Sequence, residues 1–197
     1  MRIKTLALPI LLVSLMLTSL ACTVFVGGPD YSSLPAIPVS AEAAASIQQE
    51  LQRAIEAGAQ TGVITINLTE PQVTSYLAAR MRSDPELQQT DRTPLISEPQ
   101  VYLRDGQMQI YGKSQRGMFA ANIGIIVQVG VDAEGKPLIE ITSADFGPFP
   151  APEGLKNAIT AMVREAYTGS LGPVATGLRI DTISIAGGVM SISGRIR

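Results

Sequence analysis

The longest regular pattern in this chain runs from Phe119 to Val131, where every second residue is apolar. A repeat of two predicts a β-strand of roughly 45 Å, well beyond the usual length of about five or six residues. Gly124 and Gly130 fall on the less apolar face, where the missing side chains permit a bend. We therefore expect a long, curved sheet with an apolar concave side.

Three other segments place apolar residues at helical spacing. Ser40 is suited to cap a helix that continues to Gly58. Thr69 and Gln72 form a capping box before a short helix over residues 73–81. A second long helix is predicted over residues 152–168, beginning with a proline at its first position.

The remaining patterned segments predict strands. Residues 62–68 alternate, and residues 101–112 form a hairpin through the turn Asp105-Gly106. A return strand follows over 138–146, and a closing hairpin covers 178–196, whereas residues 83–99 are polar and predict a surface loop. Together the elements predict an α+β fold, in which a long curved antiparallel sheet wraps around one or two long helices.

The two predicted hairpins carry the same pattern in their second strands. Residues 106–113 read GQMQIYGK and residues 188–195 read GVMSISGR. The resemblance has two explanations. One is the common alternation of any strand, and the other is a repeated unit of helix plus hairpin, each laying its helix on the same sheet.

The beginning of the chain has the pattern of an export signal. Arg2 and Lys4 precede a run without charge that extends to Asp30. We expect residues 1–22 to be a signal peptide or membrane anchor, residues 23–39 to be a Pro/Gly-rich tether, and residues 40–197 to form a single domain. All interpretations of this start place the domain on the extracytoplasmic side of the cell membrane.

Cys22 is the only cysteine, and it closes a segment that resembles a bacterial lipobox, although Ser19 stands where leucine is usual. The resemblance implies a lipoprotein with Cys22 as its lipidated first residue. Two alternatives remain: an uncleaved helix, because the uncharged run is long enough to span a bilayer, and ordinary secretion. A single cysteine allows no internal disulfide.

Charge and residue types restrict the function. Apart from Arg2 and Lys4, the chain has 13 basic and 17 acidic residues, which argues against a nucleic-acid partner. No histidine occurs, so Ser-His and Cys-His catalysis and histidine-ligated zinc are excluded. Catalysis by carboxylates alone would need Glu140, Asp145 or Asp181 to converge. We expect no enzyme, no cofactor and no metal.

The order of the elements resembles that of small bacterial TULIP-like (tubular lipid-binding) domains, including the LmeA-like and YpmS-like membrane-anchored proteins. The resemblance lies in residues 66–77, in the hairpin over 99–112, and in the ending that starts with the sequence FGPFP at 146–150. It covers nearly all of residues 40–197 and rests on no catalytic residue. It implies a long helix cradled by a curved sheet, with a phospholipid or acyl chain between them.

We therefore expect a membrane-tethered protein that binds an apolar ligand in a groove between helix and sheet. Eight residues are predicted to line this groove: Val73, Leu77, Ile123, Ile125, Val127, Ile159, Met162 and Val163. Taken singly, each of them is more typical of an ordinary core than of a groove. The alternative is a membrane-anchored interaction or structural module with a filled core, which would contact an unknown protein partner through a sheet edge.

Overall fold

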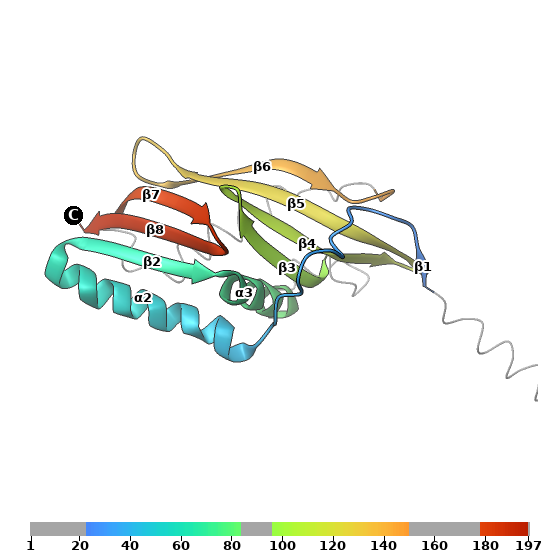
Figure 1. The fold of residues 1–197 in the computed structure, drawn as a ribbon, viewed down its shortest axis with the longest axis horizontal. Helices are drawn as coiled ribbons and strands as arrows, with labels where there is room; N and C mark the ends of the chain where they lie inside the picture. The colour runs from blue at the N-terminus through green and yellow to red at the C-terminus, as the bar shows by residue number, and fades with distance from the viewer. Residues whose placement is uncertain (1–22, 84–95, 150–177, 197) are drawn as a thin grey trace, which may run out of the picture.

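The computed structural model describes residues 23–83, 96–149 and 178–196. These residues form two helices and two sheets, which confirms the α+β class (Figure 1). In chain order the elements are β1 (Val24–Phe25), α2 (Ala41–Thr61), β2 (Val63–Thr69), α3 (Glu70–Ser83), β3 (Ser97–Arg104), β4 (Gln107–Arg116), β5 (Phe119–Val131), β6 (Pro137–Asp145), β7 (Leu178–Ala186) and β8 (Val189–Ile196).

The larger sheet is built around β5, the long strand that the sequence predicts. One edge of β5 pairs with β4 and then β3, and the other edge pairs with β1 and β6. The pair β1–β5 is parallel and the other pairs are antiparallel. The sheet is strongly curled (Figure 1). Irregularities at Ser97/Gln100 and at Ile126/Val127 contribute to the curl, because β-bulges increase the local twist.

The smaller sheet has the order β2-β8-β7 and is antiparallel. Helix α2 runs along β2, and α3 packs against both α2 and β3 (Figure 1). The described residues share one hydrophobic core, to which both helices and strands of both sheets contribute. The two sheets are therefore parts of one packed body.

Helix α2 begins where predicted but ends later. Ser40 caps it, since its Oγ accepts a hydrogen bond from the Ala43 N–H at 3.0 Å. The predicted end at Gly58 is wrong, because the helix continues to Thr61 and terminates at Gly62 in a left-handed conformation with φ 74°. Gly58 instead allows close packing on β2, as a Cβ there would collide with the Ile64 side chain.

Residues 24–37, here called the N-terminal strap, differ from the predicted tether. The strap crosses the outer face of the larger sheet between β1 and α2 (Figure 1). The Ile37 N–H donates to Gln100 Oε1 at 2.6 Å, and Gln100 Nε2 donates to the Ile37 carbonyl at 3.3 Å. Tyr102 Oη donates to the Pro35 carbonyl at 3.1 Å. A segment without periodicity is thus ordered by distant side chains.

The strap also explains the glycine on the outer face of β5. A Cβ at Gly124 would approach Pro29 Cγ to 2.9 Å and the Tyr111 ring to 3.1 Å. Tyr31 of the strap stacks on Tyr111, with ring centroids 5.2 Å apart. Gly124 was predicted to permit a bend, and its contacts show that it also permits close approach of the strap.

The other predicted elements are present where the structure describes them, although several have different bounds. Strand β3 begins at Ser97, earlier than the predicted start at 101, because the polar segment before it already pairs with β4. The helix predicted over 152–168 and most of the predicted loop over 83–99 lie outside the described residues.

Candidate functional site

The structure brings together the predicted groove residues that it describes. Ile123, Ile125 and Val127 lie on β5, and Leu77 lies on α3, all in the same hydrophobic cluster. Val73 packs against that cluster from the first turns of α3. The other predicted residues, Ile159, Met162, Val163 and the lipidation site Cys22, lie outside the described residues.

The three β5 residues belong to a wider apolar surface. Strand register places Ile125 beside Ile110 and Val127 beside Met108 on β4. The same two β4 residues face Val101 and Leu103 on β3. We call this inner surface the apolar floor, and it consists of Val101, Leu103, Met108, Ile110, Ile123, Ile125 and Val127.

Four floor residues, those on β3 and β4, were missing from the predicted groove. Alternation identified Met108 and Ile110 as one face of a strand, but only the register shows that this face continues that of β5. No floor residue is polar. In the part of the chain that the structure describes, no buried side-chain nitrogen or oxygen lacks a hydrogen-bond partner. The floor can therefore contact an apolar group without desolvating an unpaired polar atom.

The apolar floor is covered in this structure. Val101, Leu103, Ile123, Ile125 and Val127 are each 0% exposed. Their side chains have no surface accessible to water, so they are packed as core side chains are. A ligand could reach them only if the atoms that cover the floor moved.

Polar groups from α3 fix one edge of the floor. Glu70 Oε1 accepts a hydrogen bond from the Leu103 N–H at 2.9 Å and lies 3.6 Å from Arg104 Nε. Thr74 Oγ1 accepts from the Val101 N–H at 3.0 Å. These contacts satisfy backbone donors on the edge of β3 that faces away from β4, which would otherwise be open to pairing.

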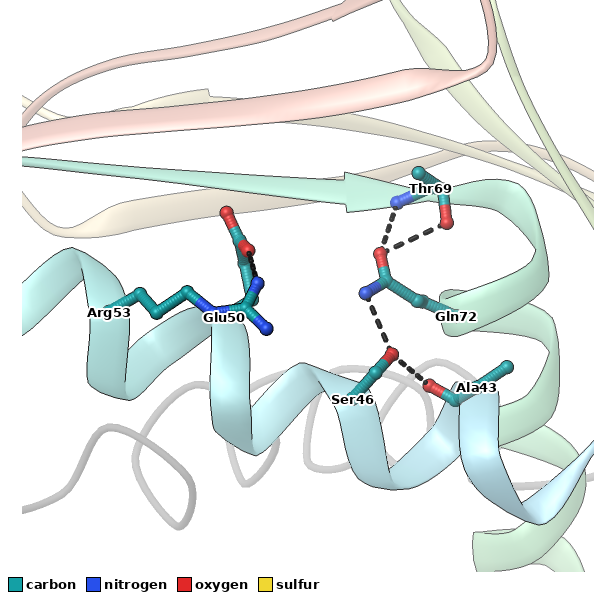
Figure 2. Close-up of polar contacts among 6 residues, drawn as sticks. All are labelled: Ala43, Ser46, Glu50, Arg53, Thr69 and Gln72. Carbon is teal, nitrogen blue, oxygen red and sulfur yellow. Dashed lines mark hydrogen bonds and ion pairs between the residues drawn. The ribbon is translucent and has the colours of Figure 1, made fainter.

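The start of α3 is fixed in turn by the predicted capping box (Figure 2). Gln72 Oε1 accepts hydrogen bonds from the Thr69 N–H at 2.9 Å and from Thr69 Oγ1 at 3.0 Å. Gln72 therefore reaches back as predicted, whereas the Thr69 hydroxyl donates to the Gln72 side chain. Gln72 Nε2 also donates to Ser46 Oγ at 2.9 Å, which links α3 to α2.

The tyrosines near the floor have structural roles. Tyr102 is 1% exposed on the opposite face of β3, and burial raises the pKa of its hydroxyl. Burial likewise raises the pKa of Tyr31. The Arg104 guanidinium lies 5.4 Å from the centre of the Tyr102 ring, within the range of a cation–π contact. These groups hold the strap on the sheet.

The carboxylates considered for catalysis lie on different sheets. Glu140 and Asp145 are exposed on β6. Asp181, on β7, is bound by Arg195, with two contacts of 2.8 Å. The hydrogen bonds from Arg195 lower the pKa of the Asp181 carboxyl. The pairing with Arg195 stabilises the charged form of Asp181. The carboxylate is therefore suited to an ion pair rather than to proton transfer near neutral pH.

Two further properties concern residues 23–83, 96–149 and 178–196 only. Within these ranges no three histidine, cysteine, aspartate or glutamate residues are grouped so that they could hold a metal ion. Within them, also, no helix is both long and apolar enough to cross a bilayer. The predicted anchor at 1–22 lies outside these ranges.

Comparison with known proteins assigns no family to this chain. No model of a known protein family matches the chain, and no curated protein matches its sequence.

Proposed function

We propose that this chain is an extracytoplasmic protein, tethered to the cell membrane through residues 1–22, that binds a phospholipid or acyl chain against the apolar floor. The observation that carries the proposal is the continuity of that floor. Seven apolar side chains on three adjacent strands form it. An acyl chain gains free energy in proportion to the apolar area that it buries, and this surface presents no polar group that would oppose it.

In this proposal the fold is TULIP-like, with the curled sheet wrapped around one or two long helices and the ligand between them. The order of β2, the Thr69-Glu70 pair, α3 and the β3–β4 hairpin supports it. The side chains of Glu70 and Thr74 explain why α3 packs beside the hairpin, because they accept hydrogen bonds from the edge of β3. The protein would act without catalysis, as a carrier or sensor of lipid near its membrane.

The complete burial of the floor favours a second candidate. With 0% exposure at Ile123, Ile125 and Val127, the core can be permanently filled, and the protein would then be a membrane-anchored interaction module. Its contact surface would be the outer edge of β6, with which none of the described strands pairs. An unpaired edge can accept a strand from another protein.

Native mass spectrometry with lipid extraction separates these candidates. The protein to use is residues 23–197 expressed in bacteria, because the strap belongs to the folded structure and a start at Ser40 would remove it. The lipid-binding proposal predicts a stoichiometric adduct with the mass of a phospholipid or fatty acid. A protein that carries no lipid and takes up none when it is added would contradict that proposal and favour the interaction module.

Matched substitutions show whether an adduct lies on the floor. Leu77 is 7% exposed beside the floor, and Leu138 is 55% exposed on β6. Leu77→Trp should displace the lipid because the larger ring occupies its volume. Leu138→Trp makes the same chemical change on the surface and should leave the adduct intact.

A further inference from the structure

Exposed apolar side chains gather at one end of the larger sheet. Val24 and Phe25 of β1 are 46% and 62% exposed, and Met118 and Phe119 at the start of β5 are 60% and 45% exposed. They are four of the seven large hydrophobic residues that are exposed in the described part of the chain. We call Val24, Phe25, Met118 and Phe119 the apolar tip.

The apolar tip is held by regular backbone pairing. Val24 pairs with Phe119 and Phe25 with Ala120 in the parallel β1–β5 register. The Val24 N–H donates to the Met118 carbonyl at 2.7 Å, and the Val26 N–H donates to the Ala120 carbonyl at 2.8 Å. The exposed side chains therefore stand on two joined strand ends, at the β1 end of the molecule (Figure 1).

The composition of the tip is unusual for this chain. The whole sequence contains four phenylalanines and no tryptophan, and two of those phenylalanines are exposed here. No charged residue occurs between Lys4 and Asp30, or between Arg116 and Asp132. Arg116, which pairs with Phe119 in the β4–β5 register, is the charged residue next to the tip. Exposed apolar side chains gathered in one place mark a surface that contacts an apolar partner.

The chain itself identifies that partner. The apolar tip begins at Val24, two residues after the segment 1–22 that the sequence predicts to be a signal peptide or membrane anchor and that carries no charge after Lys4. Two residues span at most about 7 Å, so the tip must lie next to the surface where that run ends. Aromatic and aliphatic side chains are favoured in this boundary layer of a bilayer.

We propose that the apolar tip lies in the surface of the membrane to which residues 1–22 tether the chain. The inference rests on the tether in the proposed function, and it does not depend on a ligand at the apolar floor. Insertion of the tip would orient the molecule, since β5 starts at the tip and extends about 40 Å from it at the usual rise per residue. The tether and the tip together would give two membrane contacts in place of one.

The absence of tryptophan allows a direct test on the full chain. Phe25→Trp and Phe119→Trp place a single fluorophore at exposed positions of the tip. Each variant is reconstituted into vesicles of phosphatidylethanolamine and phosphatidylglycerol, with or without brominated acyl chains. We expect the emission to shift to the blue and to be quenched by the brominated lipid.

Leu138→Trp is the control, because Leu138 is 55% exposed and lies opposite Gly130, about 35 Å from Phe119 along β5. Its emission should not be quenched. Equal quenching of tip and control variants on vesicles that carry the protein would overturn the tip proposal and leave the tether intact. Failure of the protein to float with vesicles would refute the tether and the tip together, while lipid binding is still decided by mass spectrometry.

Discussion

The β3–β4 and β7–β8 hairpins are two versions of one structure in different sheets. Both turn at two consecutive residues with positive φ, Asp105-Gly106 and Gly187-Gly188. After each turn a buried methionine is followed by a buried isoleucine: Met108 and Ile110 are each 6% exposed, while Met190 and Ile192 are 8% and 7% exposed.

The two hairpins also share an irregularity that alternation does not require. Pairing shifts at Gly112 in the first hairpin and next to Gly194 in the second, where Asp181 is the extra residue between Ile180 and Thr182. The two glycines stand at the same distance from their turns. In each case the basic residue after the glycine binds an acid in the bulge. Lys113 Nζ lies 2.6 Å from Glu98 Oε2, and Arg195 Nη2 lies 2.8 Å from Asp181 Oδ1. These shared features favour a repeated unit over general strand alternation.

The turns of the two hairpins bind each other reciprocally. The Gly106 N–H donates to the Ile185 carbonyl at 3.3 Å, and the Gly188 N–H donates to the Leu103 carbonyl at 3.1 Å. Each bond joins a turn glycine to the residue three positions before the other turn glycine. The two hairpins thus belong to two sheets that meet at these turns. The second helix of the repeated unit, predicted over 152–168, lies outside the described residues.

The surroundings of the hairpins distinguish their roles. Strand β4 lies between β3 and β5, so the first hairpin becomes part of the apolar floor. Strand β8 likewise lies between β2 and β7, but Ile183 of β7 is only half-buried, whereas the equivalent Val101 of β3 is 0% exposed. The same local pattern therefore supplies part of the apolar floor in one sheet and a less buried surface in the other.

The largest expected effect comes from shortening the equivalent isoleucines. Ile110→Ala and Ile192→Ala each remove a buried side chain between two neighbouring strands and should lower the free energy of unfolding by about 2–5 kcal/mol. Because the two residues are similarly buried, the two losses should be alike. Urea unfolding measures both, and a loss below about 1 kcal/mol for only one of them would contradict the equivalence.

Substitution of the two equivalent glycines, Gly112 and Gly194, should lower the free energy of unfolding by less. A Cβ at Gly112 would collide with Ile96 and approach the Ser97 carbonyl oxygen to 2.9 Å, and one at Gly194 would approach the Arg179 carbonyl oxygen to 2.5 Å. Gly112→Ala and Gly194→Ala should each cost about 1–3 kcal/mol.

Gly130→Ala is the matched control for the glycine pair. A Cβ at Gly130 meets no atom within 4 Å and its φ is not positive, so this change should be neutral or slightly stabilising. Thermal unfolding of the three variants tests the comparison. Equal melting temperatures for all three would show that the bulges can absorb the extra atom.

The smallest expected effect concerns pH and the Asp181–Arg195 pair. Arg195 lowers the folded-state pKa of Asp181, so the pair stabilises the fold above the ordinary carboxyl pKa of 3.8. This stability is lost as the pH falls through the lowered pKa. Asp181→Asn should flatten the dependence of melting temperature on pH in the acidic range. Arg195→Gln should flatten it equally, and unchanged slopes in both would show that the pair contributes nothing.

The sequence predicted the elements whose pattern is local. Alternation located β5, and Ser40 and the Thr69-Gln72 box marked the starts of two helices. The sequence pattern could not predict the strap, because the side chains that order the strap are distant from it in the sequence. Tyr102 bonds across 67 positions and Asn122 Nδ2 bonds to the Pro29 carbonyl across 93.

The sequence predicted only part of the candidate site, because the rest depends on contacts between residues far apart in the chain. Alternation identified the inner residues of β5, but their continuation onto Val101, Leu103, Met108 and Ile110 depends on strand register. Register is set by the pairing of distant segments and cannot be derived from one strand alone. The complete burial of the floor is also a property of packing, which no local pattern encodes.

A photoactivatable fatty acid tests the central claim most directly, because it reports both binding and place. It is added to residues 23–197, irradiated, and located by peptide mapping, with Leu77→Trp and Leu138→Trp in parallel. The account predicts attachment to peptides of β4 and β5 that carry Ile110, Ile123, Ile125 or Val127, and its loss in Leu77→Trp only. Attachment confined to exposed positions such as Leu138, or equal labelling of both variants, would contradict it.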